Sequence, residues 1–129
     1  MWYTNAIGEE KINTIFGGEF PLVGVELENI IFRAPTILQA QFLCKNLPCV
    51  IPEKWRKDEI NAISLAFSMS DIFSLTVEGG AIGFICSPDV SIYPQKAVLS
   101  ISGDGFKLHC EAKSLTIDGF TPYFDERWD

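Results

Sequence analysis

His109, the only histidine of the 129-residue chain, is the first residue to test for chemistry. A histidine acts as a general base when a nucleophile and an orienting acid converge on it. Its neighbours Leu108 and Cys110 belong to an alternation of apolar and polar residues that is typical of a β-strand. The sequence places no nucleophile and acid around His109, so we expect an exposed strand position and no catalytic residue.

Paired acids are the next candidates for catalysis. Glu26 and Glu28 are two residues apart in a predicted strand, so both project to one face of it. Such a pair can serve a glycosidase or bind a cation. Two like charges on a solvated strand face are the simpler interpretation. We therefore predict that the chain is not an enzyme.

The four cysteines, Cys44, Cys49, Cys86 and Cys110, are candidate metal ligands. Only Cys44 and Cys49 are close in sequence, and their spacing is at the wide limit for a zinc loop. Cys86 and Cys110 lie in apolar alternation, where a free cysteine packs like a small hydrophobic residue. We predict reduced structural thiols, with no metal and no cofactor.

Two segments combine charge with aromatic residues. The first, Lys54-Trp55-Arg56-Lys57, suits either an acidic ligand or a connector that folds Trp55 onto the core. The second, residues 123–129, holds aromatic residues, acids and an arginine. Aromatic residues and arginine dominate interface hot spots, but a terminal arm docked on its own domain has the same composition. Both alternatives stay open for the second segment.

The elements that position these residues begin with a helix over residues 5–18. Asn5 suits the N-cap, and Ile12, Ile15 and Phe16 form an apolar face at helical spacing. Gly17-Gly18 suits the C-terminal end, because glycine readily adopts a positive φ.

After Pro21 the pattern is that of β-strands. Gly79-Gly80 and Asp104-Gly105 predict tight hairpins, and a change of parity near Lys113-Ser114 predicts a bulge or break. Short turns imply antiparallel pairing. The fold class is therefore α+β and predominantly antiparallel β: a curved sheet, sandwich or partly open barrel of seven or eight strands with one short N-terminal helix. The predicted strands lie at about 23–32, 36–44, 61–67, 72–78, 81–86, 97–102, 106–112 and 115–117.

Length and composition fit a single domain spanning residues 1–129. Hydrophobic residues make up 47% and charged residues 21%, which are ordinary globular values. The formal net charge of −7 opposes direct binding of nucleic acid and favours a basic partner. The first residues lack the pattern of a signal peptide, and no apolar stretch reaches the ~20 residues of a spanning helix, so we predict a cytoplasmic protein without membrane contact.

Large aromatic residues predict a filled interior. The main alternative function is a small-molecule-binding, barrel-like domain, which needs an apolar cavity. An enzyme and a scaffold subunit are further alternatives. Six phenylalanines at strand positions instead suggest a packed core: Phe32, Phe42, Phe67, Phe73, Phe84 and Phe106.

Several short motifs together resemble the immunity protein 50 family of bacterial polymorphic toxin systems. They run from about residue 2 to residue 80 and are Glu10-Lys11-Ile12 through Ile15-Phe16-Gly17, Phe20-Pro21-Leu22, Pro52-x-x-Trp55, Asn61-Ala62-Ile63-Ser64-Leu65-x-Phe67, Asp71-Ile72-x-x-Leu75 and Glu78-Gly79. The resemblance implies a cytosolic protein that binds and neutralises a cognate toxin domain, and it transfers no catalytic residue.

This resemblance and the acidic charge lead to one hypothesis for the binding surface. An acidic inhibitor is steered to a basic cleft, such as that of a nuclease. Tyr123 or Trp128 would be the anchor. The acids that would meet the cations of the toxin are Glu26, Glu28, Asp104, Asp118, Asp125 and Glu126.

Overall fold

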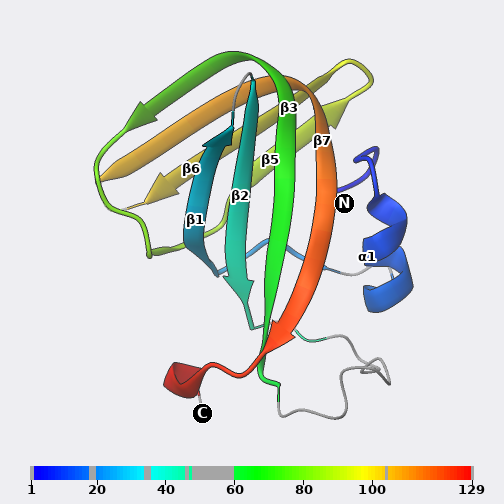
Figure 1. The fold of residues 1–129 in the computed structure, drawn as a ribbon, viewed down its shortest axis with the longest axis vertical. Helices are drawn as coiled ribbons and strands as arrows, with labels where there is room; N and C mark the ends of the chain where they lie inside the picture. The colour runs from blue at the N-terminus through cyan, green and yellow to red at the C-terminus, as the bar shows by residue number, and fades with distance from the viewer. Residues whose placement is uncertain are drawn as a thin grey trace.

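Seven antiparallel strands form one open sheet in the computed structural model, which describes residues 2–17, 20–33, 36–45, 47, 60–103 and 105–128 (Figure 1). The strand order is β4-β1-β2-β3-β7-β6-β5. The predicted fold class, a curved antiparallel sheet with one short helix, is confirmed. The elements are α1 (Glu9–Phe16), β1 (Val25–Arg33), β2 (Ile37–Cys44), β3 (Ala62–Glu78), β4 (Ile85–Cys86), β5 (Asp89–Tyr93), β6 (Lys96–Gly103), β7 (Phe106–Tyr123) and the 3-10 helix η2 (Glu126–Trp128).

Strands β3 and β7 are long and join the two parts of the sheet. They pair from Ala62–Tyr123 to Glu78–Lys107, and Figure 1 shows both curving over the top of the molecule. Strand β2 pairs only with the first part of β3, and β6 only with the first part of β7. Asp71, between these parts of β3, has a φ of 59°, and the register shifts between Ile72 and Ser74. The bend turns one long ribbon into two packed layers.

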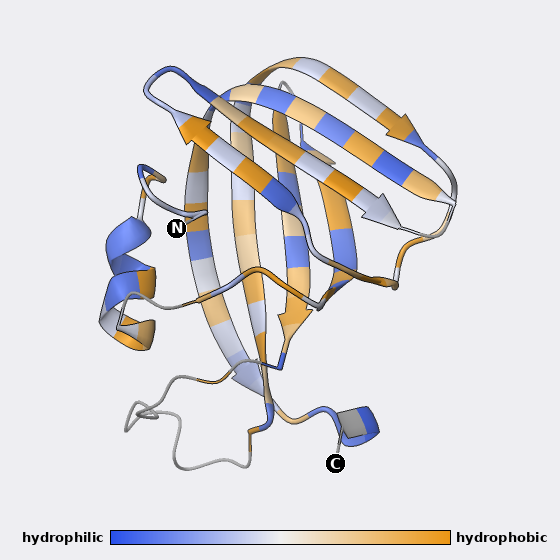
Figure 2. Cartoon of the chain, turned by 180° about the vertical axis from the view of Figure 1, so that it is seen from behind, coloured by the Kyte–Doolittle hydropathy of each residue, from blue (hydrophilic) through white to orange (hydrophobic). Residues whose placement is uncertain are grey.

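The interior is filled by buried apolar side chains of the strands. Figure 2 shows the alternating hydropathy along these strands. Phe42 and Phe67 are fully buried, with ring centroids 5.6 Å apart. Leu99 and Cys110, a cross-strand pair of β6 and β7, are also fully buried. The prediction of a packed aromatic core is confirmed for Phe42, Phe67 and Phe106.

Two of the predicted core phenylalanines are exposed. Phe32 is 56% and Phe73 is 57% exposed, so their prediction as core residues is wrong. Phe32 pairs with buried Leu38 and points to the same face, but it lies near the end of β1, where the sheet is open. Phe73 lies at the register shift of β3. The register shift between Leu27 and Asn29 brings Phe32 to this face, and no described strand pairs with the other side of β1 at that point.

The helix is shorter than predicted and begins at Glu9 instead of residue 5. Ile7 donates its N–H to the carbonyl of Leu115 and accepts the N–H of Ile117, so this segment extends the sheet as a short parallel bridge. Those backbone groups are therefore not available to a helix. Gly17 caps the C-terminal end with a φ of 66°, as predicted. Within the described ranges, no helix has the length and apolar character to cross a membrane.

Two local predictions differ from the structure around β3 and β4. β3 is one continuous strand where two were predicted, because β2 and β7 supply partners through its polar middle. Gly79-Gly80 does not form a hairpin, because β4 pairs with β1 instead of β3. The segment before β4 is held by β1, because the Leu27 N–H donates to the carbonyl of Phe84 and the Leu27 carbonyl accepts the N–H of Gly83.

Further differences concern β5 and β7. β5 lies between Pro88 and Pro94, where we predicted a loop. β7 runs without a break past Lys113-Ser114. The described shifts in the register between β3 and β7 lie on either side of that point. At one of them, Asp118 is an extra residue of β7, between Ile117 and Gly119. The hairpin between β6 and β7 is as predicted, with Gly105 at a φ of 71°.

Candidate functional site

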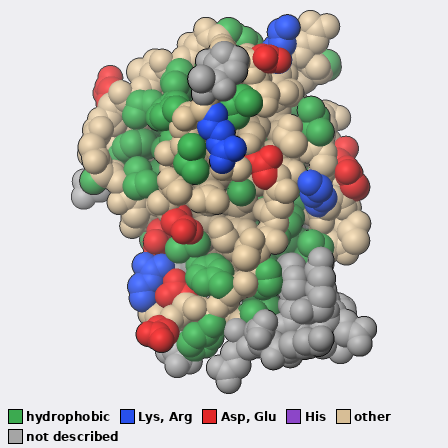
Figure 3. Space-filling view, viewed as in Figure 1, with side chains coloured by type: hydrophobic (Ala, Val, Ile, Leu, Met, Phe, Trp, Pro, Cys, Tyr) green, Lys and Arg blue, Asp and Glu red, His purple; other side chains and the backbone are tan. Residues whose placement is uncertain are grey.

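Five of the eight residues that we predicted to bind a partner come together where β1 begins and β7 ends. They form the C-terminal acidic cluster, defined here as Glu26, Glu28, Tyr123, Asp125 and Glu126. Figure 3 shows acidic side chains around a basic one at the lower left of the molecule. Asp104 and the side chain of Trp128 lie outside the described residues.

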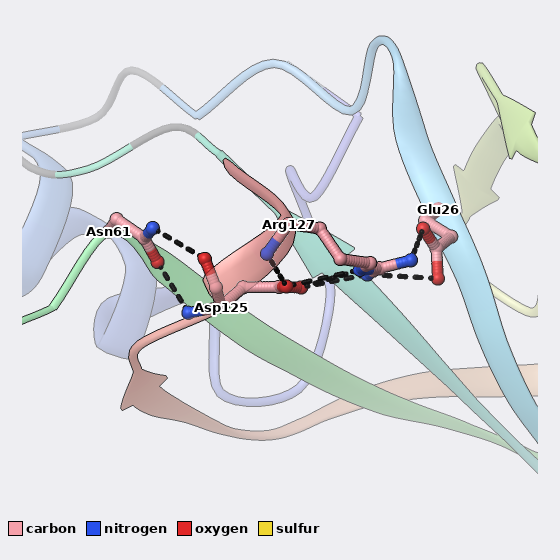
Figure 4. A network of polar contacts seen from close by, with 4 residues as sticks. All are labelled: Glu26, Asn61, Asp125 and Arg127. Atoms are coloured by element: carbon pink, nitrogen blue, oxygen red, sulfur yellow. Dashed lines mark hydrogen bonds and ion pairs between the residues drawn. The ribbon is translucent and has the colours of Figure 1, made fainter. Parts of the chain in front are cut away.

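Asn61 fixes the chain that carries the cluster. Its side-chain amide donates to the carbonyl of Asp125 at 2.8 Å and accepts the Asp125 N–H at 2.7 Å (Figure 4). The N–H of Asn61 also bonds to the carbonyl of Tyr123 at 3.1 Å. Asn61 precedes β3, so these bonds tie residues 123–125 to the central strand of the sheet. Sequence reasoning missed this role of Asn61, although the residue begins one of the motifs that carry the family resemblance.

Arg127 links two acids of the cluster that lie far apart in sequence. Its guanidinium bonds to both carboxylate oxygens of Glu26, at 3.0 and 3.4 Å, and to Asp125 at 2.7–3.2 Å (Figure 4). The Arg127 N–H also bonds to the Asp125 carboxylate at 3.0 Å. Planar, forked contacts of this kind fix geometry as well as charge. The terminal segment is therefore docked on its own domain, as one of our two alternatives for it required.

The electrostatics of the cluster follow from these contacts. Hydrogen bonds from Arg127 hold the pKa of the Asp125 carboxyl below its usual range. The same bonds, from Asp125 first and then Glu26, raise the pKa of Arg127. The side chains of Glu26 and Asp125 are only 13% and 10% exposed. Glu28 and Glu126 are exposed, so a basic partner would meet these two carboxylates first.

Tyr123 lies beside the acids with its hydroxyl covered. Among the described residues, its oxygen has no hydrogen-bond partner. Burial, followed by repulsion from the carboxylates of Asp125 and Glu28, raises the pKa of Tyr123 to about 12. A covered hydroxyl without a partner carries a desolvation cost. Tyr123 is therefore a neutral donor at the base of the cluster.

Asp118 belongs to a different group of contacts. Its carboxylate accepts hydrogen bonds from Gln39 on β2 and Ser68 on β3. These side chains lie on the outer face of the sheet, across three neighbouring strands. The structure thus does not bring Asp118 into the C-terminal acidic cluster.

His109 is exposed, as predicted, but it has partners that the sequence did not reveal. The ring contacts Ser100 at 3.0 Å through Nδ1 and Glu111 at 3.2 Å through Nε2, beside a surface hollow of about 230 Å³. Register alone produces this set, because Ser100 opposes His109 and Glu111 is two residues along β7. Glu111 also binds Lys96.

A serine hydrolase would need more than these three side chains. It stabilises an oxyanion with free N–H donors. Strands β6 and β7 each pair on both sides, so the sheet itself uses their N–H groups. The contacts of His109 are those of a solvated, charged sheet face.

The cysteines of the described chain are core residues. Cys44, Cys86 and Cys110 are buried and free of disulfides. Burial raises the pKa of the Cys44 thiol to about 12 and that of Cys86 and Cys110 to about 11. Such thiols stay protonated and unreactive at neutral pH. Cys49 and the basic run at 54–57 lie outside the described residues, and within them no three potential ligands group to hold a metal ion.

Comparison with known proteins gives one match. The family model described as Immunity protein 50 matches residues 8–123. The match extends from α1 to the end of β7, and so well beyond the motifs that end near residue 80. Neither curated proteins nor solved structures give a match.

Proposed function

Because the chain belongs to the immunity protein 50 family, we propose that it binds a cognate bacterial toxin domain and neutralises it by non-covalent occlusion. The observation that carries the proposed binding surface is the C-terminal acidic cluster. Asn61 holds the backbone of Asp125, and the forked contacts of Arg127 hold the side chains of Glu26 and Asp125, before any partner arrives. Such preorganisation lowers the entropy cost of association.

The charge of the cluster supports a basic toxin surface as the partner. The cluster holds four carboxylates, of which Glu26 and Asp125 bind the Arg127 guanidinium, and Lys45 is a further base that acts on Asp125. The cluster thus keeps a negative charge, in a chain of net charge −7. Complementary charge speeds diffusional association and suppresses wrong partners. A nuclease domain, which needs a basic cleft for its substrate, fits this description.

The packing supports protein binding over binding of a small molecule. A barrel-like carrier needs inward positions too small to fill its interior. Here the inner face carries large, fully buried side chains such as Phe42, Phe67 and Met69. The surface of the molecule is thus left to make the specific contacts. A cytosolic location, where a toxin of the producing cell or its kin would act, belongs to the same proposal.

Co-expression with the toxin domain encoded beside this gene tests the proposal. The wild-type chain should restore growth, and Glu28→Lys with Glu126→Lys should not, because these two exposed carboxylates face the partner. Glu10→Lys with Asp89→Lys is the matched control, because both acids are exposed, lie on other elements and change the net charge equally. Failure of the wild-type chain to protect cells would contradict the function. Equal protection by both double variants would contradict the proposed binding surface.

A further inference from the structure

The last part of β3 has one unpaired side among the described residues. β2 pairs with β3 only as far as Ser70, and the Ile72 N–H makes the last described bond on that side, to the carbonyl of Thr36. From Ser74 to Glu78 the strand keeps an unbroken register with β7. Its other side thus presents a regular row of backbone donors and acceptors, which is a template for another strand.

This edge lacks the features that usually protect a sheet edge. Proteins commonly place lysine, proline or a bulge there. The register shift of β3 lies before Ser74, and the sequence from Phe73 to Val77 is Phe-Ser-Leu-Thr-Val, without charge, proline or glycine. A short run of high β-propensity and no charge pairs readily with a further strand.

Apolar side chains are exposed along the same edge. Leu75 and Val77 are 38% and 42% exposed, although their partners Cys110 and Leu108 are buried on the same face. Phe73, at the start of this edge, is more exposed still. Figure 3 shows hydrophobic side chains gathered at the upper left, the side where β3 ends in Figure 1. A strand added here would continue the inner face of the sheet and cover Leu75 and Val77.

Charge decides between the possible occupants. Asp71 and Glu78 are the charged residues of the segment 71–78, so it has an acid at each end and no base. Lys107 lies opposite Glu78 on β7, with no described ion pair between them. In an antiparallel pair with a second copy of the chain, Leu75 of one copy would lie opposite Leu75 of the other. Asp71 of each copy would then lie within one position of Glu78 of the other, so acids would meet acids. A strand with an apolar middle and basic ends is the complementary occupant.

We propose that the free edge of β3, Ser74–Glu78, receives a β-strand of the toxin domain, with an apolar middle and a lysine or arginine at its ends. The inference rests on the proposed function and adds a second contact surface to the C-terminal acidic cluster. Backbone hydrogen bonds supply affinity in this binding mode, and the pockets for alternate side chains supply specificity. The toxin would then be held by the edge of β3 and steered by the cluster.

The test uses the full chain and an inactive form of the toxin domain encoded beside this gene. Amide hydrogen exchange of the wild-type chain should slow at residues 74–78 on binding. Val77→Lys should weaken binding at least about tenfold, because it places a charged side chain of β3 against the strand that is added. Tyr93→Lys should bind like the wild type, because Tyr93 is exposed on β5, at the other end of the sheet, and the variant carries the same change of charge.

Three results would overturn the inference. The first is toxin binding with unchanged exchange at residues 74–78 and with equal affinity of Val77→Lys and Tyr93→Lys, which leaves the proposed function intact. The second is concentration-dependent protection of these amides in the chain alone, which would place a second copy there. The third is no binding by the wild-type chain, which would overturn the proposed function as well. The exchange measurement needs no variant, so it decides even if Val77→Lys folds poorly.

Discussion

Replacement of Asn61 by alanine tests whether this side chain holds the C-terminal segment in place. The change removes two hydrogen bonds, from Asn61 Nδ2 to the Asp125 carbonyl and from the Asp125 N–H to Asn61 Oδ1. Both are short and partly buried, and each is worth about 0.5–1.5 kcal/mol. The free energy of unfolding should therefore fall by about 1–3 kcal/mol. This loss cannot exceed the free energy with which the C-terminal segment docks, because the chain can release the segment and stay folded.

Urea unfolding and amide exchange together measure this effect. In thermal unfolding, each kcal/mol lost from the free energy of unfolding lowers Tm by about 4 °C in a domain of this length. The Asp125 amide, which loses its acceptor, should exchange faster, whereas the Asn61 amide keeps its bond to the Tyr123 carbonyl. Asn29→Ala is the matched control, because among the described residues the Asn29 side-chain amide bonds to the Gln41 side chain and to no backbone group.

The reasoning about Asn61 would be refuted by one combination of results. Asn61→Ala would unfold at the same urea concentration as the wild type, and the Asp125 amide would exchange no faster. The anchor of the segment would then lie elsewhere, and the preorganisation of the C-terminal acidic cluster would need another cause.

Three further predictions concern the core and the cluster. Phe67→Ala should cost about 3–5 kcal/mol in urea unfolding, and Phe32→Ala less than about 1 kcal/mol, because only Phe67 is buried; equal losses would contradict the burial. Absorbance at 295 nm should show an ionisation near pH 12 that Tyr123→Phe removes; the contribution of this tyrosine to the free energy of unfolding is complete below pH 10 and is lost as pH rises through 12. The pKa of the Asp125 carboxyl, followed by NMR, should lie below its usual range and rise in Arg127→Met. The contribution of this carboxyl to the free energy of unfolding is present above the usual carboxyl pKa and is lost as pH falls through the lowered value. An unchanged pKa in Arg127→Met would show that Arg127 is not the cause.

Local patterns were sufficient for β1, β2 and β6 and for much of the core, whereas β5 was missed and β3 and β7 were each predicted as two strands. The alternation of Leu38, Ala40, Phe42 and Cys44 placed all four side chains on one face, and all four are buried. Alternation depends on neighbours along the chain, which the sequence states directly. The immunity protein 50 resemblance likewise rested on short local motifs, and the family match confirms it.

Contacts between distant segments could not be predicted. Arg127 meets Glu26 across 101 positions, and Asn61 meets Asp125 across 64. No local pattern specifies which strand end lies beside which terminus. Exposure of Phe32 and Phe73 was missed for the same reason, because a strand face is buried only where another part of the chain reaches it.

The association rate between this chain and the inactive toxin domain, followed against salt concentration, tests the central claim most directly. The claim is that an acidic exterior, and not an enclosed site, performs the function. We expect the rate constant to fall steeply as ionic strength rises, and the Glu28→Lys, Glu126→Lys variant to lose most of this dependence. A rate that is indifferent to salt, or that is unchanged in this variant, would contradict the account.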